Sequence, residues 1–131
     1  MGTRSAIVKK TKDGYTGIYC HWDGYPSWNG KILQEHYNTE DKVEELIALG
    51  DLSGLRENVA PKGADHTYDT PEDGVTIAYH RDRGRDFNQS VGSTVEEVVS
   101  KIDNEYAYVF ENGEWTCNGM PLAEAIYSDG E

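Results

Sequence analysis

A β-hairpin is the first element that the sequence predicts, and it lies in SAIVKKTKDGYTGIYCHW (residues 5–22). Residues 5–9 form a short β-rich run, and Asp13-Gly14 is typical of a tight turn between antiparallel strands. The partner strand is expected to run from Tyr15 to Trp22. An aromatic, turn-rich loop over 23–30 then leads away from the hairpin.

Helices are predicted from caps and apolar periodicity in four places. They are 31–37, a helix from a cap at Asn38 or Thr39 to a stop at Gly50, a helix after Ser93 with Glu96 in the capping-box position, and 121–127. The second and third helices have one apolar side each, formed by Val43, Leu46, Ile47 and Leu49 and by Val95, Val98, Val99 and Ile102.

Further strands are predicted on both sides of a long polar segment. Residues 75–81 (VTIAYHR) are expected to form a central strand, and 106–117 a second hairpin that turns on Asn112-Gly113. Leu52 and Leu55 are expected in a tight turn. Residues 57–74 are predicted to be a long polar loop and 128–131 a frayed tail.

This order of elements predicts a single α+β domain over residues 1–131. We expect a mostly antiparallel sheet of about five strands, with two to four helices packed on one face. A length of 131 residues suits one domain that folds without a metal or a disulfide.

The formal net charge of −12 opposes general binding to nucleic acid or to an anionic membrane. Residues 1–37 hold five basic and three acidic side chains, whereas residues 38–131 hold seven basic and 21 acidic ones. The acidic excess predicts a binding surface on two helices that could imitate nucleic-acid phosphates toward a partner protein. Its candidate residues are Glu40, Asp41, Glu44, Glu45, Glu96 and Glu97.

Residues 79–86, YHRDRGRD, concentrate three arginines in this acidic chain. Arginines beside a glycine are suited to a bidentate grip on carboxylate or phosphate, and nearby aromatic rings can stack on a base. The candidate ligand residues are His21, Asp23, Tyr25, Trp28, His80, Arg81, Arg83 and Arg85, with Tyr79 as a further stacking candidate. The interpretation favoured from the sequence is a salt-bridged turn in which Asp82 and Asp86 neutralise the arginines.

Two His/Asp pairs raise a third hypothesis, a metal or acid–base site. Alternation places His21 and Asp23 on the Tyr19 face of one strand, and His80 and Asp82 repeat that spacing on the predicted strand 75–81. The four side chains would meet only if those strands were neighbours. A structural role for the histidines is favoured, and no metal, cofactor or catalytic residue is predicted.

Compartment signals are few. No segment has the roughly 20 apolar residues of a membrane span, and no signal peptide is expected. Cys20 and Cys117 lack metal or redox spacing, so two free thiols are predicted.

Several sequence blocks resemble a family of small proteins common in bacteriophage and prophage genomes. The blocks are TRS (3–5), YCHWDGYP (19–26), NG (29–30), KV to LGDLS (42–53) and YHRDRG (79–84). That family has no settled activity. The resemblance implies a phage-encoded accessory protein that acts in the cytoplasm of the bacterial host.

The leading prediction is a non-enzymatic, anti-CRISPR-like inhibitor of a host or defence protein that acts through its acidic surface. The target would be a nucleic-acid-binding effector. The alternative is a protein that sequesters a nucleotide signal with the turn from Arg81 to Arg85. A His/Asp metal or acid–base enzyme comes third. The sequence leaves the oligomeric state open.

Overall fold

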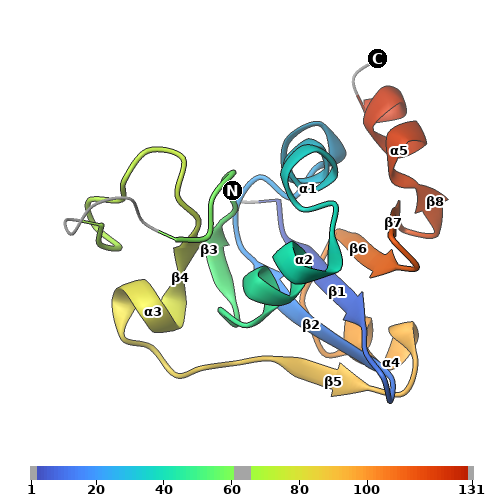
Figure 1. The fold of residues 1–131 in the computed structure, drawn as a ribbon, viewed down its shortest axis with the longest axis horizontal. Coiled ribbons are helices and arrows are strands. Elements are labelled where there is room, and N and C mark those ends of the chain that lie inside the picture. Colours follow the sequence, from blue (N-terminus) through green and yellow to red (C-terminus); the bar gives the residue numbers. More distant parts are fainter. Residues whose placement is uncertain (1–2, 61–65, 130–131) are drawn as a thin grey trace.

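The computed structural model describes residues 3–60 and 66–129, and it is an α+β fold (Figure 1). The strands are β1 (Ser5–Lys10), β2 (Tyr15–Cys20), β3 (Leu52–Gly54), β4 (Ile77–Ala78), β5 (Ser90–Gly92), β6 (Tyr106–Glu111), β7 (Glu114–Cys117) and β8 (Met120–Pro121). The helices are the π-helical turn η1 (Pro26–Gly30), α1 (Lys31–His36), α2 (Glu40–Ile47), α3 (Tyr79–Arg83), α4 (Val95–Ser100) and α5 (Leu122–Asp129).

The strands form one mixed sheet in the order β4-β3-β2-β1-β6-β7-β8, and β5 also pairs with β2. Most neighbours are antiparallel, but β1 pairs parallel with β6, and β2 pairs parallel with β3. The predicted α+β class is therefore confirmed, while the strands are more numerous than the five expected. The additional strands are two or three residues long, too short to give an alternating sequence pattern.

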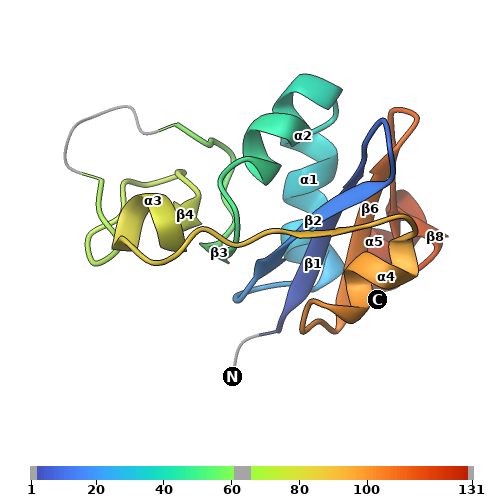
Figure 2. The ribbon, with the colours of Figure 1, turned by 90° about the horizontal axis from the view of Figure 1, so that it is seen from below.

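Helices cover both faces of this sheet, so the prediction that they pack on one face is wrong (Figure 2). Helices α1, α2 and α5 contribute Leu33, Leu46 and Leu122 to the larger core cluster. Helix α4 contributes Val98 to a second cluster on the opposite face, with Val8 and other small side chains of the sheet. Because β1 and β6 are central, both of their faces are apolar.

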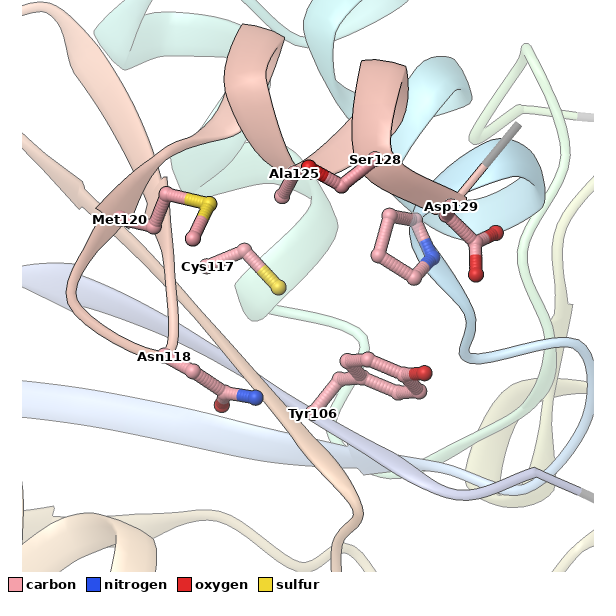
Figure 3. Close-up of a pocket in the computed structure, with 8 residues that line it drawn as sticks. Tyr106, Cys117, Asn118, Met120, Ala125, Ser128 and Asp129 are labelled. Atoms are coloured by element: carbon pink, nitrogen blue, oxygen red, sulfur yellow. The ribbon is translucent and has the colours of Figure 1, made fainter. Parts of the chain in front are cut away.

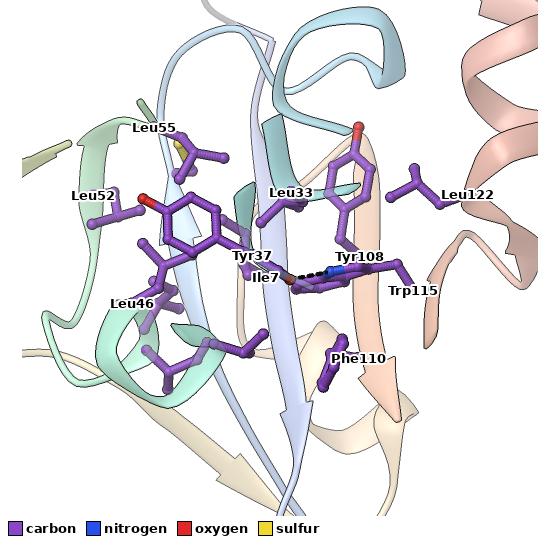
Figure 4. Close-up of a cluster of buried hydrophobic side chains, with 14 of the residues drawn as sticks. Ile7, Leu33, Tyr37, Leu46, Leu52, Leu55, Tyr108, Phe110, Trp115 and Leu122 are labelled. Atoms are coloured by element: carbon purple, nitrogen blue, oxygen red, sulfur yellow. Dashed lines mark hydrogen bonds between the residues drawn. The ribbon is translucent and has the colours of Figure 1, made fainter. Parts of the chain in front are cut away.

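The larger core is built around three aromatic side chains that also satisfy buried backbone groups (Figure 4). Trp115 donates from Nε1 to the carbonyl of Tyr37 at 2.7 Å, and Tyr108 donates from its hydroxyl to the carbonyl of Gly24 at 2.6 Å. Tyr37 donates in turn to the carbonyl of Arg56 at 2.7 Å. Burial raises the pKa of Tyr37 to about 12, so these hydroxyls remain protonated donors.

Both predicted hairpins are present. Residues 11–14 join β1 to β2, and Asn112 and Gly113 (φ 54° and 79°) form the turn between β6 and β7. Positive φ at both turn positions matches the right-handed twist of the strands, which explains the Asn-Gly pair. Asn118 and Gly119 repeat this conformation (φ 51° and 86°) and add the unpredicted strand β8.

The cap of α4 lies one residue later than predicted. Thr94, rather than Ser93, is the N-cap, and its hydroxyl accepts from the amide of Glu97 at 3.2 Å. The Glu97 carboxylate accepts from the amide of Ser93 at 2.9 Å, so Glu97 takes the place expected for Glu96. At α2, Thr39 is the cap, one of the two predicted residues.

Residues 75–81 do not form the predicted central strand. Only Ile77–Ala78 forms a strand, β4 at the end of the sheet order, while Val75 makes an isolated bridge to Asn58 and the chain enters α3 after Ala78. The Asp82 carboxylate accepts from the amide of Ala78 at 2.8 Å, and Gly84 ends the helix with φ 73°. The hydrogen bond from the Ala78 amide to Asp82 favours the start of a helix over continuation of the strand that residues 75–81 would otherwise prefer.

Three smaller expectations also differ from the structure. Residues 52–54 form β3 instead of a tight turn, and Pro26–Gly30 form a π-helical turn in the predicted loop. Asp129 ends α5 and accepts from the amide of Ser27 at 3.0 Å, so the described part of the predicted tail is anchored. Part of the predicted 57–74 loop, residues 61–65, lies outside the described residues.

Candidate functional site

A hollow of about 430 Å³ lies between β2 and the segment that follows α3. We call it the β2–α3 pocket. Its lining combines arginine, aromatic and acidic side chains from four places in the sequence. The lining residues are Tyr19, His21, Asp51, Tyr79, Arg83, Arg85, Asp86 and Asn88.

The β2 side of the pocket comes from the predicted alternation of the first hairpin. Tyr19 and His21 lie on the same side of the strand, and the Tyr19 hydroxyl contacts His21 Nδ1 at 2.6 Å. Burial raises the pKa of the Tyr19 hydroxyl. The exposed Trp22 ring stands edge-on to His21, with ring centroids 4.5 Å apart. An aromatic edge therefore borders this side of the pocket.

Asp51 joins the two walls of the pocket. Its amide donates to the carbonyl of Asn88 at 3.1 Å, and its carbonyl accepts from the amide of Tyr79 at 3.2 Å. Its side chain accepts from the amide of Tyr19 at 2.9 Å. Burial raises the pKa of the Asp51 carboxyl, although the Tyr19 amide opposes that shift.

The three arginines of the predicted ligand turn have different environments. The Arg81 guanidinium donates to Asp82 at 2.9 Å, to the carbonyl of Thr76 at 2.7 Å and to the carbonyl of Val59. These hydrogen bonds fasten α3 to Thr76, just before β4, and to Val59. Arg81 does not line the β2–α3 pocket.

Asp82 is the centre of that arrangement, with only 4% of its side chain exposed. Burial alone would raise the pKa of Asp82, but Arg81, the Ala78 amide and His66 outweigh it and hold the pKa below its ordinary value. His66 Nε2 lies 3.2 Å from the Asp82 carboxylate, and its Nδ1 accepts from the amide of Glu72 at 2.9 Å. The salt-bridged turn predicted from the sequence therefore forms, with Arg81 as the arginine that pairs with Asp82.

Arg83 and Arg85 form no ion pair with any residue in the ranges 3–60 and 66–129. Both line the pocket, and the Arg83 guanidinium lies over the ring of Tyr68, 4.6 Å from its centroid. Asp86, expected to neutralise them, lines the same pocket without pairing to either. Two cationic groups thus remain available at one hollow.

The other predicted ligand aromatics lie elsewhere. Tyr25 and Trp28 do not line the pocket, and Trp28 instead lies 5.9 Å from the Arg56 guanidinium. Among the predicted candidates, the structure brings together His21, Tyr79, Arg83 and Arg85. Sequence reasoning missed Asp51 and Asn88 as site residues because their approach depends on long-range backbone contacts.

The proposed His/Asp cluster does not form, because His80 and Asp82 lie on α3 and not on a strand. His80 Nδ1 contacts the carbonyl of Arg85 at 2.8 Å, and its ring packs edge-on against Phe87. Asp23 adopts a positive φ of 57° where the chain turns toward η1. No group of three or more His, Cys, Asp or Glu side chains in the described parts of the chain is placed to hold a metal ion.

The six acidic candidates form two separate groups. Glu40, Asp41, Glu44 and Glu45 are exposed on α2, whereas Glu96 and Glu97 lie on α4, across the sheet. The Glu44 carboxylate lies 3.6 Å from the nearly buried Lys9 ammonium. The predicted acidic surface is therefore limited to one helix on each face.

A second hollow, of about 310 Å³, lies between α5 and the strands β6 to β8 (Figure 3). Tyr106, Cys117 and Met120 surround it, with Asp129 at its edge. Both cysteines are free and buried, and burial raises the pKa of Cys20 and of Cys117 to about 11. Neither thiol is placed to act as a nucleophile near neutral pH.

No helix in the described ranges has the length and apolar character required to cross a bilayer. No family model, no curated protein and no solved structure matches this chain.

Proposed function

We propose that this protein is a non-enzymatic, phage-encoded binding protein that sequesters a small anionic ligand of the nucleotide class in the β2–α3 pocket. The observation that carries the proposal is the pair Arg83 and Arg85, which line one hollow and pair with no carboxylate among the described residues. Its place of action would be the cytoplasm of the bacterial host.

The chemistry of the lining supports this ligand class. Guanidinium groups bind phosphate oxygens bidentately, and aromatic rings such as Tyr19 and Tyr79 offer faces on which a base can stack. The net charge of −12 repels anions in general. Two arginines without acidic partners in the described ranges would create a local positive potential that attracts an anion to this pocket.

The test is isothermal titration of wild-type protein with pyrophosphate and a panel of nucleoside monophosphates and cyclic dinucleotides. Arg83→Ala and Arg85→Ala should each weaken binding about tenfold or more, since a charged hydrogen bond contributes about 1.5–3 kcal/mol. Arg4→Ala is the matched control, because Arg4 pairs with Asp103 and lies outside the pocket. Unchanged affinity in both pocket variants would reject the proposal.

A second candidate is the inhibition of a host or defence protein, such as a CRISPR effector, by the acidic side of α2. It is supported by the exposure of Glu40, Asp41, Glu44 and Glu45 on two turns of one helix. Affinity capture from phage-infected cells followed by mass spectrometry would identify the partner.

Paired charge reversals distinguish that candidate from the first. Glu44→Lys with Glu45→Lys should abolish capture of the partner and leave nucleotide binding unchanged. The control is Glu114→Lys with Glu124→Lys, the same change of charge at exposed positions on β7 and α5. Equal capture by both double variants would eliminate the α2 surface as the docking site.

A further inference from the structure

Asp51 places a carboxylate inside a pocket that we propose binds an anion. It lies between Gly50, which has a positive φ of 77°, and β3. Its backbone is bonded to both Asn88 and Tyr79, which line opposite ends of the segment around α3. The position of the carboxylate is therefore fixed by the same contacts that form the pocket.

The Asp51 carboxylate has capacity for a further hydrogen bond. One oxygen accepts from the Tyr19 amide at 2.9 Å, and no cation in the described ranges pairs with the group. An ionised carboxylate has about four lone-pair sites on its two oxygens. Because the side chain is only partly exposed, water does not fully screen its charge from a ligand in the same hollow.

A bare anion would be repelled by this carboxylate, whereas a ligand with an N–H or O–H donor beside its anionic group would be attracted to it. We propose that Asp51 is the specificity-determining residue of the pocket. It accepts a hydrogen bond from a donor on the nucleoside part of the ligand, while Arg83 and Arg85 hold the phosphate. This inference rests on the proposed function and deepens it.

The test uses Asp51→Asn, which keeps an amide oxygen for the Tyr19 amide and replaces the second oxygen with a donor. In titrations, this variant should bind a ribonucleoside 5′-monophosphate at least tenfold more weakly than wild type does. Its affinity for pyrophosphate, which lacks a nucleoside, should be equal to that of wild type or higher.

Two further ligands identify which donor meets Asp51. If the donor is a ribose hydroxyl, ribose 5-phosphate should retain the dependence on Asp51 and the 2′,3′-dideoxynucleotide should lose it. If it is a base amino group, the dideoxynucleotide should retain the dependence and ribose 5-phosphate should not show it. Either pattern supports the proposal.

Asp86→Asn is the matched control, because it removes the same charge from the same pocket at an exposed residue. It should raise the affinity for nucleotide and for pyrophosphate by similar small factors. The proposal is overturned if Asp51→Asn behaves in the same way, with the ratio of the two affinities unchanged. Failure of the proposed function would differ, since wild type would then bind none of these ligands.

Discussion

The centre of the sheet and the region around α3 are held together by different forces. In β1 and β6, Ile7, Tyr108 and Phe110 are 0–1% exposed, and burial of apolar surface dominates. Helix α3 buries no apolar side chain, and the hydrogen bonds of Asp82 and Arg81 fix it. The first region makes the fold stable. The second leaves arginines available at a pocket.

The largest expected effect is in the first region. Phe110→Ala should lower the free energy of unfolding by about 3–5 kcal/mol, because it removes a buried ring that packs on Trp115 and leaves a cavity. Urea denaturation followed by circular dichroism would measure this loss. Phe110→Leu, which keeps most of the buried volume, should lose clearly less. Equal losses in the two variants would contradict control by packing.

An intermediate effect is expected in the α3 region. Asp82→Asn should cost about 1–3 kcal/mol, because it removes the charge that Arg81 and the Ala78 amide face. Hydrogen exchange should be faster at the amides of Ala78 and Tyr79 while the amides of β1 and β6 remain protected. Uniform acceleration across the sheet would show that the two regions unfold as one.

The same variant has a defined pH dependence. The folded-state pKa of Asp82 is lowered, so its contribution to stability is complete above the unfolded value of about 4 and is lost as the pH falls through the folded value. The stability difference between wild type and Asp82→Asn should therefore shrink as the pH falls below about 4. A difference that grows on acidification below about pH 4 would contradict this sign.

The smallest effect concerns the cap of α4. Thr94→Ala should cost about 1 kcal/mol, because the Thr94 hydroxyl accepts the amide of Glu97. Ser93→Ala should change stability by less than about 0.5 kcal/mol, since the contact of Glu97 with the Ser93 amide does not need the side chain. Thermal unfolding of both variants would locate the cap.

The difference between the two regions also explains what the sequence could predict. Strand alternation and turn pairs act between near neighbours, so both hairpins and α2 were predictable from residues 5–22, 38–50 and 106–117. Residues 75–81 have strand propensity. However, the Asp82 side chain, four positions after Ala78, accepts a hydrogen bond from the Ala78 amide at the start of a helix. Such competition between a side chain and a strand ladder depends on tertiary contacts.

The candidate site was predictable in part for the same reason. Clustering in residues 79–86 singled out Arg81, Arg83 and Arg85 together, and alternation placed Tyr19 on the same face as His21. The separation of Arg81 from its two neighbours required the carbonyls of Val59 and Thr76, which no local pattern reveals.

The parallel pairing of β1 with β6 has a consequence for how the chain folds. Ser5 lies opposite Tyr106, so β1 acquires its second neighbour only after most of the sequence has been synthesised. Pairings of such high contact order are slow to form, and until then one edge of β1 is open. During translation the edge of β1 that later pairs with β6 therefore stays open, and truncation before β6 would leave this edge available for aggregation.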